Sequence, residues 1–162
     1  MPASKIATTA LMFIGASPSG TGGGIKTTTA LMLLFFVVTV VTGKKDTVVM
    51  ERRMNKDVMM RAITIATLAF VFVGFITMLL CIIEQHHIAA SDLLFETVSA
   101  FGTVGLSTGI TYTLSPLSQI LIMLTMFAGR VGVFTMSLAV AKRMRKQDTS
   151  NIRYPEDRVM IG

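Results

Sequence analysis

The sequence predicts an all-α integral membrane protein, and three observations lead to that prediction. Hydrophobic residues make up 52% of the 162 residues, charged residues make up 15%, and the mean hydropathy is +0.67, a balance unlike that of a soluble domain. The charged residues gather in clusters, which leaves long uncharged runs between them. One apolar run is also longer than a membrane is thick, and glycines interrupt it.

The first element is the apolar stretch from Ile6 to Thr42, which contains the glycine-rich run Ser17–Lys26. As one helix, its 37 residues would extend about 55 Å, whereas the hydrocarbon core of a bilayer is about 30 Å thick. We therefore expect a broken transmembrane helix. Irregular backbone at membrane depth is tolerated where it is buried in protein or lines a watery cavity. The break accordingly indicates a path for an ion or a solute.

Two further segments are long enough to cross the membrane as helices. Ile63–Ile83 has 21 residues without a charge, and Leu117–Ala141 has 25 residues with a single charge, Arg130. Between them, a helix that starts at the N-cap residue Ser91 and ends at Ala100 would extend only about 15 Å. A stretch rich in Gly, Ser and Thr follows it. We expect a re-entrant helix and loop here, not a third span.

Charge placement predicts how the chain is oriented in the membrane. Six basic and three acidic residues lie within Lys44–Arg61, and the same numbers lie within Lys142–Gly162, whereas Glu84–Pro116 contains no Lys or Arg. Short basic loops stay on the cytoplasmic side. Both basic segments, and with them the C-terminus, are therefore expected in the cytoplasm, and the re-entrant segment enters from outside. Membrane topology explains the basic excess, so nucleic-acid binding need not be invoked.

The order of outer helix, half-helix, narrow loop and inner helix is typical of a cation pore. The half-helix would point its partially negative C-terminal end toward the membrane centre, with Thr103, Val104 and Gly105 running past it. Glycine permits the dihedral angles that turn backbone carbonyls toward a dehydrated cation. The predicted fold is thus a helix–re-entrant pore loop–helix repeat preceded by a broken transmembrane helix.

Two acidic residues accompany the half-helix. Asp92 and Glu96 are four residues apart and would lie on one face near its N-terminal end. They either complement the helix dipole or draw cations to the mouth of the pore. The sequence does not separate these two roles.

The glycine-rich run Gly20–Thr27 also invites comparison with a phosphate-binding loop. Such a loop needs adjacent Gly and Lys, so that the lysine reaches the phosphates from the helix start, and Ile25 breaks that spacing. We therefore expect no nucleotide-dependent enzyme, and no other enzyme is indicated.

Four motifs together resemble the Trk/Ktr/HKT superfamily of potassium transporters, most closely the membrane subunit of Ktr-type bacterial potassium uptake systems. They are SPSGTGGGIKTTT (Ser17–Thr29), SAFGTVGLSTG (Ser99–Gly109), GRVG around Arg130 and YPEDRVMIG (Tyr154–Gly162). The family has four consecutive helix–pore loop–helix repeats around one potassium path. The resemblance covers essentially the whole chain and implies the end of that architecture, from the second helix of the third repeat onward.

The resemblance implies a division of the chain into four parts. Residues 1–43 would be the broken second helix of the third repeat, with an intramembrane loop at 17–24. Residues 44–62 would be a basic cytoplasmic linker, and 63–141 the complete fourth repeat. The basic cytoplasmic tail would comprise 142–162.

The resemblance also implies roles for single residues. Thr103, Val104 and Gly105 would form the ion filter, with potassium held by backbone carbonyls near Gly105. Arg130 would match an arginine that points into the pore and helps to hold a gating loop. That loop would consist of Gly20, Thr21, Gly22, Gly23 and Gly24.

The family implies several partners for the chain. These are membrane lipid, the remaining repeats, a second copy in a homodimer, and a cytosolic ring of nucleotide-binding regulatory subunits. The chain would be a fragment of a pore-forming subunit in a multi-pass transporter of the bacterial cell membrane, either truncated or part of a split protein. No covalent cofactor is expected. Potassium is the transported ion, while sodium as a coupling ion and the selectivity between the two stay open. The alternative is a small cation channel that assembles from several copies.

Overall fold

The computed structural model of the chain describes residues 2–17, 20–43, 48–49, 52–53, 56–84, 88–132 and 135. Helices dominate, and the exception is a short antiparallel hairpin that pairs Val48 with Arg53 and Val49 with Arg52. The elements in order are α1 (Pro2–Phe13), α2 (Thr27–Val41), β1 (Val48–Val49), β2 (Arg52–Arg53), α3 (Lys56–Ile83), α4 (Ala90–Gly102), the 3₁₀ turn η1 (Ile110–Tyr112) and α5 (Pro116–Val131).

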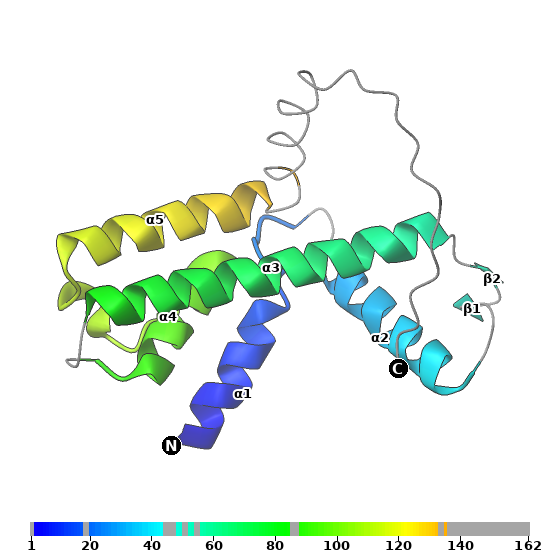
Figure 1. The fold of residues 1–162 in the computed structure, drawn as a ribbon, viewed down its shortest axis with the longest axis horizontal. Helices are drawn as coiled ribbons and strands as arrows, with labels where there is room; N and C mark the ends of the chain where they lie inside the picture. The colour runs from blue at the N-terminus through cyan, green and yellow to red at the C-terminus, as the bar shows by residue number, and fades with distance from the viewer. Residues whose placement is uncertain are drawn as a thin grey trace, which may run out of the picture.

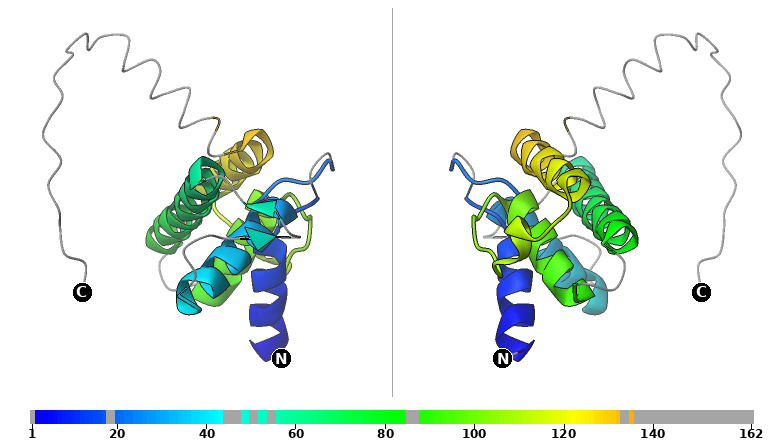
Figure 2. Two further views of the ribbon diagram at one scale, coloured as in Figure 1. Left: turned by 90° about the vertical axis from the view of Figure 1, so that its right-hand side faces the viewer. Right: turned by 90° about the vertical axis from the view of Figure 1, so that its left-hand side faces the viewer.

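The short helix α4 lies at the centre of the structure. It packs against α5, α3 and α1, and α1 lies on the far side of α4 from α5 (Figures 1 and 2). Nine of its 13 residues are buried, among them Leu93, Phe95 and Phe101. At about 1.5 Å per residue α4 is roughly 20 Å long, which is less than the thickness of a bilayer core. A short, enclosed helix is therefore present where the half-helix was predicted, and its re-entry into a membrane stays a prediction.

One helix in the described part of the chain is long and apolar enough to cross a membrane. It comprises Val58–Ile83 within α3, with a mean hydropathy of 2.7 in its most apolar window. Large apolar side chains on α3 face outward, including Phe70 at 72% exposed and Met78 at 63% exposed. Outward apolar surface over such a length is suited to lipid. This agrees with the span predicted for Ile63–Ile83.

The predicted interruption of the first apolar stretch is present, because α1 ends at Phe13 and α2 begins at Thr27. The ends of the non-helical segment lie side by side in a parallel bridge between Ile14 and Ile25, with the Gly15 amide donating to the Ile25 carbonyl at 2.7 Å. The segment from 14 to 26 is thus a folded-back loop, with residues 18–19 outside the described part. We refer to it below as the glycine loop.

Two predicted helix ends differ from the structure. Ser91 does not cap α4: the cap residue is Ala89, whose carbonyl accepts from the amides of Asp92 and Leu93, and no side chain caps the helix. The helix starts one residue before Ser91 because the backbone turns at Ala89, and a β-region cap residue needs no hydroxyl to do so. The helix α5 ends at Val131, within the span predicted for Leu117–Ala141, and most of the remainder of that span, up to Ala141, lies outside the described residues.

The crossing of α5 over α4 depends on Gly129. A Cβ atom at this position would overlap the carbonyl oxygen of Phe101, so the two helices touch through their backbones. Small residues commonly permit such close approach between membrane helices. By contrast, a Cβ at Gly74 in α3 would meet nothing within 4 Å.

We therefore expect Gly129→Ala to destabilise the fold and Gly74→Ala to leave it unchanged or slightly more stable. Overpacking costs about 1–3 kcal/mol, which should lower Tm by roughly 5 °C. Thermal unfolding of the full chain in detergent micelles, followed by circular dichroism, measures both variants. Equal stability of Gly129→Ala and the unaltered chain would contradict the backbone contact.

Candidate functional site

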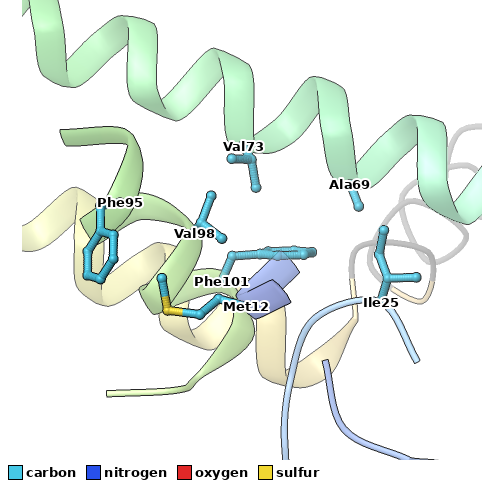
Figure 3. Close-up of a cluster of buried hydrophobic side chains, with 7 residues drawn as sticks. All are labelled: Met12, Ile25, Ala69, Val73, Phe95, Val98 and Phe101. Atoms are coloured by element: carbon cyan, nitrogen blue, oxygen red, sulfur yellow. The ribbon is translucent and has the colours of Figure 1, made fainter. Parts of the chain in front are cut away.

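The candidate site lies where the glycine loop, the C-terminal end of α4 and the end of α5 meet. A buried apolar cluster supports this junction, and Phe101 lies within it close to Met12 and Val98 (Figure 3). The ring of Phe101 also stacks on Phe13, with centroids 6.0 Å apart. The last turn of α4 is thereby fixed against α1.

Glycines bring the backbones of this junction into direct contact. A Cβ at Gly23 would lie 2.9 Å from the carbonyl oxygen of Phe101 and 3.0 Å from that of Gly129. A Cβ at Gly102 would lie 2.7 Å from the Met12 carbonyl oxygen. Side chains at these positions would force the three segments apart. Gly23, which was predicted to belong to the gate, thus packs closely against α4 and α5.

Thr103 ends α4 in the left-handed conformation, with φ of 51°, and is the one non-glycine residue with positive φ in the described ranges. Its hydroxyl oxygen accepts a hydrogen bond from the Gly23 amide at 2.7 Å. A β-branched residue is strained in this region, and such strain persists where the surroundings impose it. The bond to Gly23 is one such constraint, and it links the predicted filter to the glycine loop.

A cavity of about 410 Å³ adjoins this link. Gly22 of the glycine loop lines it together with Thr103 and Val104 of the predicted filter. Gly105 is absent from the lining, although it is exposed and its φ of 84° is accessible mainly to glycine. The remaining lining residues are Thr8, Leu11, Met12, Ile14, Gly15, Ala16, Gly102 and Leu106.

The remaining residues of the predicted gate and its holder take different positions. Gly20 and Thr21 are exposed at the tip of the loop, whereas Gly23 is buried. Arg130 is exposed in the last turn of α5, directly after the closely packed Gly129. In the described part of the chain, hydrogen bonding at the loop involves Thr103 and not Arg130.

The structure separates the two acids predicted to act from one face of α4. Asp92 lies in the first turn, where it suits the helix dipole, and forms an ion pair with Lys5 at 2.5 Å. Glu96 lies in the middle of the helix and is 5% exposed, so the dipole interpretation is wrong for it. Its carboxylate instead accepts hydrogen bonds from Ser107, Thr108 and Thr111.

Two further contacts of charged residues were not predicted from the sequence. The Lys26 ammonium donates to the Gly22 carbonyl oxygen at 3.1 Å and so ties the glycine loop to the start of α2. Glu84 accepts from the amide and the hydroxyl of Ser115, at 2.9 and 2.8 Å, and joins the end of α3 to the start of α5. The Ser115–Pro116 pair is a recognisable helix start, but nothing in the sequence identifies its partner.

The hydrogen bond between Gly23 and Thr103 should protect the Gly23 amide from hydrogen exchange with solvent. In Thr103→Val the branched shape stays but the acceptor is lost, so the Gly23 amide should exchange with solvent about fivefold faster. In Thr103→Ser the acceptor stays and protection should be retained. Hydrogen exchange of the chain in micelles, read by NMR, measures both, with the Gly15 amide as an internal reference. Unchanged Gly23 exchange in Thr103→Val would refute the link.

Comparison of the sequence with known proteins places the chain in a family. The family model TrkH, described as a cation transport protein, matches residues 1–152. The chain is 42% identical over 153 residues to the Ktr system potassium uptake protein D of Bacillus subtilis, covering 94% of this chain and 33% of that protein. It is 38% identical over 157 residues to the Ktr system potassium uptake protein B of the same organism, covering 96% and 34%.

A third relative, the potassium/sodium uptake protein NtpJ of Enterococcus hirae, is 31% identical over 170 residues, covering 99% of this chain and 36% of that protein. The chain thus spans about a third of the length of the curated relatives it matches.

Proposed function

Because this chain belongs to the TrkH family of cation transport proteins, we propose that it forms part of the pore-forming subunit of a potassium, or monovalent cation, uptake transporter. The observation that supports this most directly is the hydrogen bond between Gly23 and Thr103. It brings the loop that breaks the first apolar helix against the end of a buried half-helix, beside a cavity that both segments line. In this proposal the cavity is part of the ion passage and the glycine loop is its closure.

In this proposal Thr103, Val104 and Gly105 form one wall of the ion filter. The C-terminal end of α4, with its partial negative charge, lies directly before them and favours a cation. Backbone carbonyls of this segment replace water around potassium. Gly105 is the residue whose positive φ lets the chain turn there.

The glycine loop acts as the gate below this filter. Gly20 and Thr21 are exposed and Gly22 is partly exposed, while Gly23 and Gly24 are packed against the end of α4 and Gly23 also lies beside Gly129 of α5. Arg130 follows Gly129, whose carbonyl oxygen lies 3.0 Å from the Cβ position of Gly23, and in this proposal Arg130 helps to hold the loop. A charge on a membrane helix calls for a partner or a watery cavity, and loop carbonyls are suitable acceptors.

The rest of the transporter supplies the other walls of the path. An almost wholly apolar groove of about 900 Å³ runs between α1, α3 and α4, lined by residues such as Ile6, Phe70 and Leu94, and could hold another transmembrane helix of the transporter.

We further propose that the protein lies in the cell membrane, with Lys44–Arg61 and the C-terminus on the cytoplasmic side. Its proposed partners are a second copy in a homodimer and a cytosolic ring of nucleotide-binding regulatory subunits.

The proposal is tested by replacing the third of the Bacillus subtilis potassium uptake protein D that this chain matches with this chain. We expect the chimera to restore growth of potassium-uptake-deficient cells at limiting potassium, because the rest of the relative supplies the other three walls of the filter. The chain expressed alone should not restore growth. Rescue by the chain alone would favour the self-assembling channel, and a membrane-inserted chimera without uptake would contradict the proposed function.

The filter assignment predicts the effect of a single substitution in that chimera. Gly105→Ser should lower the ratio of potassium to sodium uptake toward parity, because it disturbs the carbonyls that replace water. Gly43→Ser is the matched control, since Gly43 also has positive φ and open space around its Cβ position but lies at the end of α2. Isotope uptake assays measure both ratios. Equal ratios in the two variants would exclude Gly105 from the filter.

A further inference from the structure

The buried carboxylate of Glu96 holds the chain segment that follows the proposed filter. Its Oε1 accepts from the Ser107 hydroxyl at 2.5 Å and from the Thr108 amide and hydroxyl at 2.8 and 3.3 Å. Its Oε2 accepts from the Thr111 hydroxyl at 3.2 Å. All four bonds come from one short segment that begins two residues after Gly105.

These bonds are the compensation that makes a buried carboxylate tolerable. An acidic group shielded from water is costly unless it is fully hydrogen-bonded or paired. The ion pair found in the described residues joins Lys5 to Asp92, so Glu96 relies on the hydroxyl and amide donors of 107–111. Hydrogen bonds to a charged acceptor are about twice as strong as neutral ones. Segment 107–111 is therefore attached firmly to the middle of α4.

The stretch from Thr103 to Ser107 is consequently anchored at both ends. At one end the Gly23 amide and the last turn of α4 hold Thr103. At the other end Glu96 holds Ser107. Between these anchors Gly105 has no atoms within 4 Å of its Cβ position and does not belong to any regular element. The positions of the backbone carbonyls in this stretch thus depend on the two anchors and not on packing around Gly105.

We propose that Glu96 is a positioning residue for the filter: by fixing 107–111 it holds the carbonyls around Gly105 at the spacing that selects among cations. This inference rests on the proposed function and goes beyond it, because it assigns selectivity to a carboxylate that does not contact the ion. Asp92 lies one turn before Glu96 on α4, but it does not share this role, since its charge is neutralised by Lys5 of α1.

The test compares variants of the chimera described above by their potassium-to-sodium uptake ratio. Glu96→Gln keeps the shape but removes the charge, and should lower the ratio about fivefold while total cation uptake is retained, as expected when a charge-assisted hydrogen bond becomes a neutral one. Asp92→Asn removes the same charge from the same helix and should leave the ratio unchanged. An unchanged ratio in Glu96→Gln, or an equal loss in Asp92→Asn, would overturn the proposal.

A substitution in the loop tests the same contact without changing a buried residue of α4. Ser107 is exposed, so Ser107→Ala removes one donor to Glu96 without opening the core. It should lower the ratio in the same direction by a smaller factor. The double variant should lose less than the two single losses combined, because both changes weaken the same contact. Fully additive losses would show that Glu96 acts by another route.

A second readout does not depend on transport. In the full chain in micelles, the Thr108 amide should exchange faster in Glu96→Gln and at the normal rate in Asp92→Asn. If the unaltered chimera transports no potassium, the proposed function fails, and this exchange experiment still decides whether Glu96 orders the loop. Unchanged Thr108 exchange in Glu96→Gln would reject the inference by itself.

Discussion

Direct backbone contact between three segments is the constraint on which the rest of the structure depends. Gly23, the end of α4 at Phe101, and Gly129 of α5 approach without side chains between them. Movement of the glycine loop therefore changes the surroundings of the last turn of α4 directly, and the hydrogen bond from Gly23 to Thr103 strengthens this coupling. A gate and a filter built on these segments would be coupled by contact alone.

The distribution of polarity explains why a short helix can occupy the centre. Polar groups such as Glu96, Thr97 and Thr125 are buried, while apolar side chains such as Phe70 and Phe75 face outward. Lipid cannot supply hydrogen bonds, so a re-entrant segment must be enclosed by protein and must meet its polar needs there. Glu96 accepts the hydrogen bonds of the loop that returns from α4, and α3 packs against α4 while it presents apolar side chains outward.

Length and composition made the main elements predictable. The break before Thr27, the long helix ending at Ile83 and the short helix near Ser91 follow from comparing apolar runs with the thickness of a bilayer. The helix α4 begins at Ala90 and not at the predicted Ser91. Serine is a common cap residue and so suggests a helix start in the sequence, whereas in the structure Ala89 is the cap. Partners far apart in the chain, such as Lys5 with Asp92, leave no local signal.

The sequence by itself determined that this is a membrane protein with an interrupted helix and a half-helix ending in a glycine-containing loop, because these features depend on local composition and length. Only the tertiary structure decided that Gly23 bonds Thr103, that Glu96 holds the segment after Gly105, and that Gly129 lets α5 touch α4. Each of these contacts joins residues whose proximity is produced by helix packing, and packing geometry is not encoded in any short stretch of chain.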